Sequence, residues 1–152
     1  MKVGKYFTLA EMTVTGTGLK NVPTEDEIDN IRKTVEVLDI IREELEVSIK
    51  VNSGFRSTVV NNAVGGSKTS AHRLGLAADI IAPSYKDGNV YELAIAIQKI
   101  LKEHNIEFDQ LILEFNRWIH IGFSKTKGRK MYLTAVKNSK GRTLFKVGIL
   151  KG

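Results

Sequence analysis

The sequence contains no cysteine, and this absence narrows the chemistry that the chain can perform. Disulfide bonds and thiolate metal sites are both excluded, so any metal site must be built from histidine, aspartate and glutamate side chains. Histidine is scarce as well, because the 152 residues include only three, His72, His104 and His120. The candidates for a metal site are therefore few.

Long hydrophobic runs are also missing. No segment approaches the roughly 18 apolar residues of a membrane-spanning helix, and the first ten residues contain no apolar stretch suited to a signal peptide. Internal repeats and low-complexity linkers are absent too. We therefore expect one monomeric domain over residues 1–152, made in the cytoplasm without membrane insertion. If the protein works outside the membrane, another component must release it.

Basic side chains outnumber acidic ones. A net charge of +6 indicates a basic surface, with lysines concentrated towards the end of the chain. Such a surface favours anionic partners, whether nucleic acid, an acidic membrane or a bacterial cell wall. Because no basic stripe interleaved with aromatic residues and no nucleic-acid motif is found, we expect no nucleic-acid partner.

The hydrophobic pattern predicts a mixture of helices and strands. Apolar residues at helical spacing predict helices over residues 24–46 and 90–103, and Thr24 followed by Glu27 is a capping-box signature. A shorter helix is expected over 59–64. Apolar or alternating runs predict strands over 47–52, 78–82, 111–115 and 118–123, and a terminal hairpin over 131–136 and 143–147. The expected fold class is α+β, with a small antiparallel sheet packed by two main helices.

Asp79 stands at the head of an apolar run that is typical of a buried strand. A buried carboxylate costs several kcal/mol unless it is paired, so Asp79 needs a cation, a hydrogen-bond network or a metal as its partner. His72 precedes it by seven residues. The short loop over 65–70, rich in glycine and serine, leads the chain to His72.

His120 lies on an alternating segment, where it shares one face of a strand with Trp118 and Gly122. A single histidine on a strand is commonly a structural hydrogen-bonding residue. Together with His72 and Asp79, however, it can supply the three protein ligands of an open catalytic zinc site. Spacing alone leaves both interpretations open. His104, at the polar end of a helix, is expected to be structural or exposed.

A zinc hydrolase also needs a general base, and Glu114 is the candidate. It ends an apolar run six residues before His120, so the chain must turn back between the two. A two-residue turn would put Glu114 on the face opposite His120, whereas a three-residue connection over 115–117 would pair Glu114 with Trp118 and bring it to the His120 face. We predict the three-residue connection. The alternative is a hairpin-end carboxylate in water.

Arg56 follows a Ser-Gly turn at the end of a predicted strand. A guanidinium there could bind a substrate carboxylate or the oxyanion that develops during hydrolysis. A salt bridge to a surface carboxylate is the alternative.

These motifs form a joint pattern spanning residues 7–124. In chain order they are Ser53-Gly54-Phe55-Arg56-Ser57, Asn62, Gly65-Gly66, Ser70-x-His72-x-x-Gly75-x-Ala77-x-Asp79 and Trp118-Ile119-His120. The pattern resembles the zinc D-alanyl-D-alanine carboxypeptidases, and among them the small phage and bacterial peptidoglycan peptidases, whose metal-site architecture is shared by the hedgehog signalling domain.

The resemblance implies zinc ligands at His72, Asp79 and His120, and a transition-state arginine at Arg56. It implies a catalytic base at Glu114, although many members carry the base three residues before the second histidine, where this chain has Arg117. Asp109 is the next carboxylate to consider. Ser70 supports the site by a hydrogen bond or is a plain loop hydroxyl. The motifs do not reach the segment after Ser124.

The function implied is zinc-dependent hydrolysis of peptidoglycan peptides, either by a D-Ala-D-Ala carboxypeptidase or by an endolysin-type endopeptidase of phage or prophage origin. Two other classes stay open. One is a catalytically silent zinc-containing binding module, and the other is a structural component of a phage particle.

Overall fold

Two long helices form where the apolar spacing predicted them. In the computed structural model, which describes residues 1–152, they are α2 (Glu25–Leu45) and α4 (Val90–Glu103). The side chain of Thr24 accepts a hydrogen bond from the backbone of Glu27, and the Glu27 side chain accepts one from the backbone of Thr24, so the predicted capping box is confirmed.

A six-stranded sheet forms the centre of the molecule, in the spatial order β1-β2-β4-β3-β5-β6. The strands are β1 (Lys50–Ser53), β2 (Ala77–Ile81), β3 (Gln110–Glu114), β4 (Trp118–Gly122), β5 (Met131–Lys137) and β6 (Thr143–Val147). Together with the helices, this sheet confirms the α+β class.

One pair of strands is parallel, although an antiparallel sheet was expected. β3 and β5 run in the same direction, while every other neighbouring pair is antiparallel. The reason lies in where β4 ends. Its last residue, Gly122, is paired with Gln110, the first residue of β3. Because β5 begins at that same end and on the other side of β3, it must run parallel to β3.

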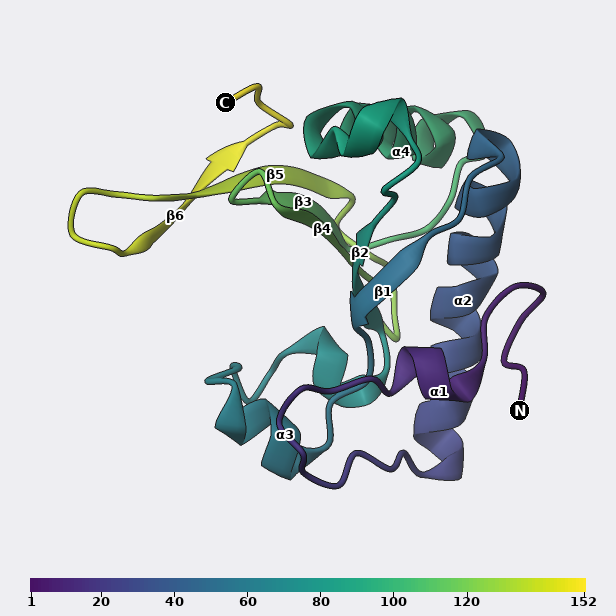
Figure 1. The fold of residues 1–152 in the computed structure, drawn as a ribbon. Coiled ribbons are helices and arrows are strands. Elements are labelled where there is room, and N and C mark those ends of the chain that lie inside the picture. Colours follow the sequence, from purple (N-terminus) through teal and green to yellow (C-terminus); the bar gives the residue numbers. More distant parts are fainter.

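The sheet has one face in the core and one face that carries polar groups. Side chains such as Ala78, Ile80, Leu111, Ile119 and Ile121 belong to the core cluster that packs against α2 and α4. Figure 1 shows α2 and α4 on one side of the sheet and α3 on the other, while the β5–β6 hairpin extends outward from one edge of the sheet. Because side chains alternate along a strand, the residues between these core positions face away from α2 and α4.

The remaining elements are short. They are α1 (Leu9–Met12), α3 (Thr58–Ala63) and the 3-10 turns η1 (Ala71–Leu74) and η2 (Lys86–Gly88). α1 was not predicted, although Thr8 and Glu11 form a capping box at its start. The strand expected over 47–52 begins later, at Lys50. None of the helices combines the length and the hydrophobicity that crossing a bilayer requires.

Candidate active site

Strand pairing brings Asp79 and His120 together. Asp79 on β2 is the register partner of His120 on β4, so both side chains project from the polar face of the sheet. The Nδ1 atom of His120 lies 3.0 Å from Oδ1 of Asp79. Two strands that are about 40 residues apart in sequence thus converge on one carboxylate oxygen.

His72 reaches the same oxygen from η1. Its Nε2 atom lies 3.2 Å from Oδ1 of Asp79, and its Nδ1 atom is 2.7 Å from the carbonyl oxygen of Gly54. That carbonyl can only accept a hydrogen bond, so Nδ1 carries the proton and donates it. The hydrogen bond therefore leaves the lone pair of Nε2 directed at Asp79, as in a ligand oriented by a backbone carbonyl.

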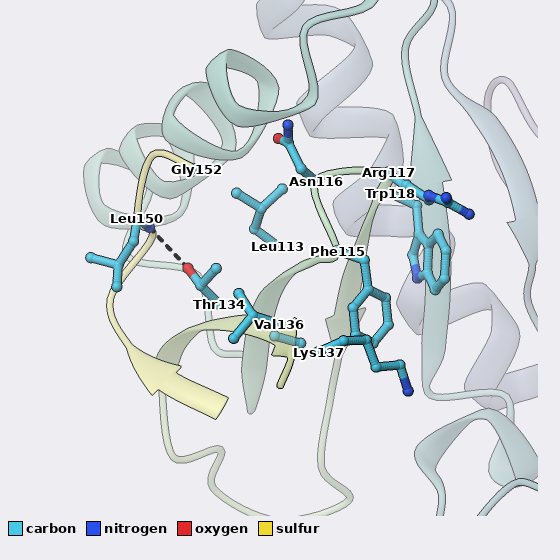
Figure 2. A pocket seen from close by; sticks show the side chains of 11 residues that line it. Leu113, Phe115, Asn116, Arg117, Trp118, Thr134, Val136, Lys137, Leu150 and Gly152 are labelled. Carbon is cyan, nitrogen blue, oxygen red and sulfur yellow. Dashed lines mark hydrogen bonds between the residues drawn. The ribbon is translucent and has the colours of Figure 1, made fainter. Parts of the chain in front are cut away.

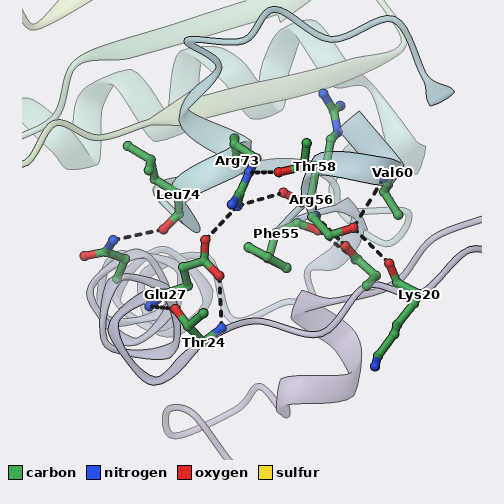
Figure 3. Close-up of polar contacts among 12 residues, drawn as sticks. Lys20, Thr24, Glu27, Phe55, Arg56, Thr58, Val60, Arg73 and Leu74 are labelled. Carbon is green, nitrogen blue, oxygen red and sulfur yellow. Dashed lines mark hydrogen bonds and ion pairs between the residues drawn. The ribbon is translucent and has the colours of Figure 1, made fainter. Parts of the chain in front are cut away.

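A polar network fixes the turn that carries His72 (Figure 3). Arg73 donates hydrogen bonds to Oε2 of Glu27 at 2.7 Å and to Oγ1 of Thr58 at 3.0 Å. Glu27 is also part of the α2 capping box, and the backbone N–H of His72 bonds to Oγ of Ser70 at 3.3 Å. These contacts tie η1 to the first turn of α2 and to α3.

The three side chains together have the donor set of a metal site. Each offers one ligand atom, and all of these atoms lie within 4.8 Å of one another. Burial lowers the pKa of His72 and so favours its neutral form. A neutral Nε2 facing a carboxylate sets two lone pairs against each other, and a cation between them resolves the conflict. The cluster therefore fits a metal ion.

The charge on Asp79 is maintained by its neighbours. Burial alone raises the pKa of Asp79, but the hydrogen bond from His120 outweighs that effect and holds the pKa well below its usual range. Asp79 is thus an anion despite its burial. The partner that the sequence required for this carboxylate is the pair of histidines, which is the arrangement a metal ligand set needs.

Arg56 points into this site. Its guanidinium nitrogen lies 3.6 Å from Oδ2 of Asp79, with the arginine side chain 18% exposed. Its Nε–H donates a hydrogen bond of 3.2 Å to Oγ of Ser53. The alternative of a surface salt bridge is therefore wrong.

Glu114 lies on the same face as His120. It is the register partner of Trp118, so the predicted three-residue connection is confirmed, with Phe115 and Asn116 in the left-handed region at φ 55°. Burial, and next to it the negative charge of Asp79, raise the pKa of Glu114 above its ordinary value. A carboxylate with a raised pKa next to a ligand cluster has the character of a general base.

A family model described as Peptidase M15 matches residues 5–122, a range that contains all five of these side chains. The chain belongs to the peptidase M15 family. No curated protein matches this M15 peptidase. Among solved structures it is similar to the Serratia marcescens L-Ala D-Glu endopeptidase ChiX, with 21% identity and a TM-score of 0.44, over 67% of this chain and 89% of that one.

The other acidic and histidine candidates of the M15 peptidase lie away from the cluster or are paired with another side chain. Asp109 accepts hydrogen bonds from Arg129, including one of 2.8 Å, so it is occupied by a cation. His104 pairs with Glu44 at the ends of α4 and α2, away from the cluster, as expected for a structural or exposed residue.

The site of this M15 peptidase opens into a groove of about 710 Å³. The loop over 64–70 lines one part of it, and Lys137, Thr143 and Phe145 of the β5–β6 hairpin line another. No functional role was predicted for these hairpin residues from the sequence. Their only sequence signal is the alternation of side chains along β5 and β6. That alternation shows which residues share a face, but not which face lines the groove until the pairing partner is known.

Trp118 borders both this groove and a second cavity, of about 700 Å³, which lies between β3, β5 and the C-terminal residues (Figure 2). Its buried indole Nε1–H has no hydrogen-bond partner. The indole lies beside Glu114, where a hydrogen bond from its N–H would oppose the rise in the pKa of that carboxyl. It is a donor that remains free beside Glu114.

Proposed function

We propose that this M15 peptidase is a zinc metallopeptidase that hydrolyses peptide bonds in the stem or cross-link peptides of bacterial peptidoglycan. One observation carries the proposal: the ligand atoms of His72, Asp79 and His120 converge within 4.8 Å, and Glu114 lies on the same face of the sheet.

His72, Asp79 and His120 would hold the zinc ion. Two histidines and one carboxylate are a protein ligand set used by zinc sites that keep one position open. When bound, zinc supplies Lewis-acid polarisation of the scissile carbonyl and makes water acidic enough to be deprotonated near neutral pH. The Gly54 carbonyl keeps His72 in the tautomer that presents Nε2.

Glu114 acts as the general base and then as the general acid. Its carboxylate takes a proton from the attacking water and later gives it to the amine that leaves. The raised pKa of Glu114 suits this double role, because a base whose pKa lies nearer the working pH returns the proton more readily.

Arg56 stabilises negative charge. Its guanidinium is held beside the cluster by Ser53 and by Asp79, where it can donate hydrogen bonds to the oxyanion of the tetrahedral intermediate or to a substrate carboxylate. Its low exposure strengthens this interaction, because a desolvated charge is screened less.

Two features support peptidoglycan as the substrate. The motif pattern resembles peptidoglycan peptidases, and the net charge of +6 attracts the protein to an anionic cell wall. The enzyme would act at the wall after release. Both the carboxypeptidase and the endopeptidase reactions use the same ligand set and base.

The test is digestion of purified peptidoglycan by the zinc-loaded protein, with the products identified by mass spectrometry. New peptide fragments that the Glu114→Gln variant does not produce are expected, and their masses identify the bond that is cut. Peptidoglycan left intact by zinc-loaded wild-type protein would overturn the proposal.

A further inference from the structure

The C-terminal hairpin extends the face of the sheet that carries the candidate active site. Glu114 on β3 pairs with Ala135 on β5, which in turn pairs with Phe145 on β6. Because paired residues project from the same face of a sheet, Phe145 lies on the side of Glu114 and His120. The hairpin lies outside residues 5–122, which the family model matches, and Figure 1 shows it projecting away from the rest of the sheet.

Lys137 is an unpaired cation in the groove. Its Nζ donates a hydrogen bond of 2.9 Å to Oγ1 of Thr143 and lies 5.1 Å from the centre of the Phe115 ring. Figure 2 shows the lysine side chain alongside that ring. No carboxylate lies within salt-bridge distance of Lys137, whereas Arg129 is paired with Asp109 and Arg56 with Asp79.

The contacts of Lys137 hold the ammonium group without neutralising it. A hydroxyl and an aromatic face both orient a cation but carry no negative charge. The ammonium therefore keeps its capacity to bind a carboxylate, and its side chain loses less conformational freedom when it does so.

Phe145 provides apolar surface beside this cation. Its side chain is 58% exposed although it lines the groove. An exposed aromatic ring next to an unpaired cation is suited to a peptide that carries both a carboxylate and an alkyl side chain.

We propose that the β5–β6 hairpin is a distal subsite of the groove, in which Lys137 binds a carboxylate of the peptide substrate while Phe145 packs against the adjoining residue. This inference rests on the proposed function for the identity of the substrate. At the usual strand spacings, the Cα atoms of Lys137 and His120 are about 16 Å apart, which corresponds to roughly four to five residues of extended peptide. The subsite thus selects long or cross-linked peptides rather than short ones.

The experiment measures binding, so that it does not depend on hydrolysis. The Glu114→Gln protein, loaded with zinc, is titrated by calorimetry with a cross-linked stem-peptide dimer. Two forms of the dimer are used, one with its carboxyl groups free and one with them converted to amides. Adding Lys137→Met should weaken binding of the free-carboxylate form about tenfold, the scale of one charge-assisted hydrogen bond, and leave the amide form nearly unchanged.

Lys146→Met is the matched control. Lys146 lies on β6 and pairs with Thr134, so it projects from the opposite face of the same hairpin and is absent from the groove lining. Removing the same charge there should leave both affinities within about twofold. Phe145→Ala should weaken both forms of the dimer, because it removes apolar contact and no charge.

The outcomes separate this inference from the proposed function. Equal losses for Lys137→Met and Lys146→Met, or equal losses for the two forms of the dimer, would overturn the distal subsite. Hydrolysis by the wild-type protein is measured separately, so an inactive protein that still shows the Lys137 effect would retain the subsite and reject the peptidase.

Discussion

Glu114 lies directly opposite Trp118 at the end of the β3–β4 hairpin, and this pairing puts its carboxylate on the face of the sheet that carries His120. A connection one residue shorter would have turned Glu114 to the other face, against the core. The location of the proposed general base thus depends on the length of one turn.

Replacing this base is expected to abolish hydrolysis without removing the metal. Glu114→Gln should reduce kcat by about 10²- to 10⁴-fold, since the proton acceptor is lost while its shape is retained. Peptide release from peptidoglycan measures the rate, and elemental analysis measures zinc. Glu103→Gln, at the exposed end of α4, serves as the control and should behave as wild type. Loss of zinc in Glu114→Gln would contradict the assignment of Glu114 as a base.

Replacing a metal ligand should reduce zinc content and thermal stability together. His120→Ala removes one of the three proposed ligand atoms, and a metal that binds only the folded state stabilises it. Wild-type protein should hold about one zinc per chain and melt at a higher temperature with zinc than with a chelator, a difference that the variant should lose. His104→Ala is the matched control, because His104 pairs with Glu44 away from the cluster. Equal zinc retention in both variants would refute the ligand set.

Gly54 should be intolerant of any side chain. A Cβ atom there would collide with the backbone carbonyl oxygen of Met12, so Gly54→Ala must displace either α1 or the Gly54 carbonyl that orients His72. We expect a loss of about 1–3 kcal/mol in the free energy of unfolding and weaker zinc binding. In contrast, Gly16→Ala meets no atom within 4 Å and should change neither. Both are measured by urea denaturation and zinc titration, and a wild-type zinc affinity in Gly54→Ala would exclude the role of this carbonyl.

Acid should lower the free energy of unfolding, and we expect part of that loss to come from Asp109. The hydrogen bonds from Arg129 lower the pKa of Asp109 in the folded state. Because the folded pKa lies below the unfolded one, this contribution to stability is complete above the ordinary aspartate pKa of about 3.9. It is lost as the pH falls through the lower folded value. Asp109→Asn should therefore flatten the fall in unfolding free energy below about pH 4.

The measurement for Asp109 is urea denaturation of the metal-free protein between neutral and acid pH, which removes any contribution from zinc release. Arg129→Gln deletes the partner of the same ion pair and should flatten the curve to a similar extent. A slope in both variants that equals the wild-type slope would rule out this pair as a source of acid sensitivity.

Much of the fold was predictable because local sequence codes for it. The Thr24–Glu27 capping box and the apolar spacing that follows located α2 to within one residue at each end. For the His72, Asp79 and His120 cluster, residue spacing left a metal site and structural hydrogen bonding both open, and the motif resemblance implied the ligand set. In contrast, α1 was not predicted, because a helix of one turn is too short to show a helical spacing of apolar residues.

The sequence by itself determined which residue types were available: no thiol, three histidines, and a carboxylate within an apolar run typical of a buried strand. Tertiary structure decided which face each of them occupies and what lies beside it. The parallel pairing of β5 with β3 brings Lys137 and Phe145 into the groove, and no local pattern in the chain specifies that pairing. Side-chain alternation has a period of two, so a residue's face is known only when its partner strand and register are known.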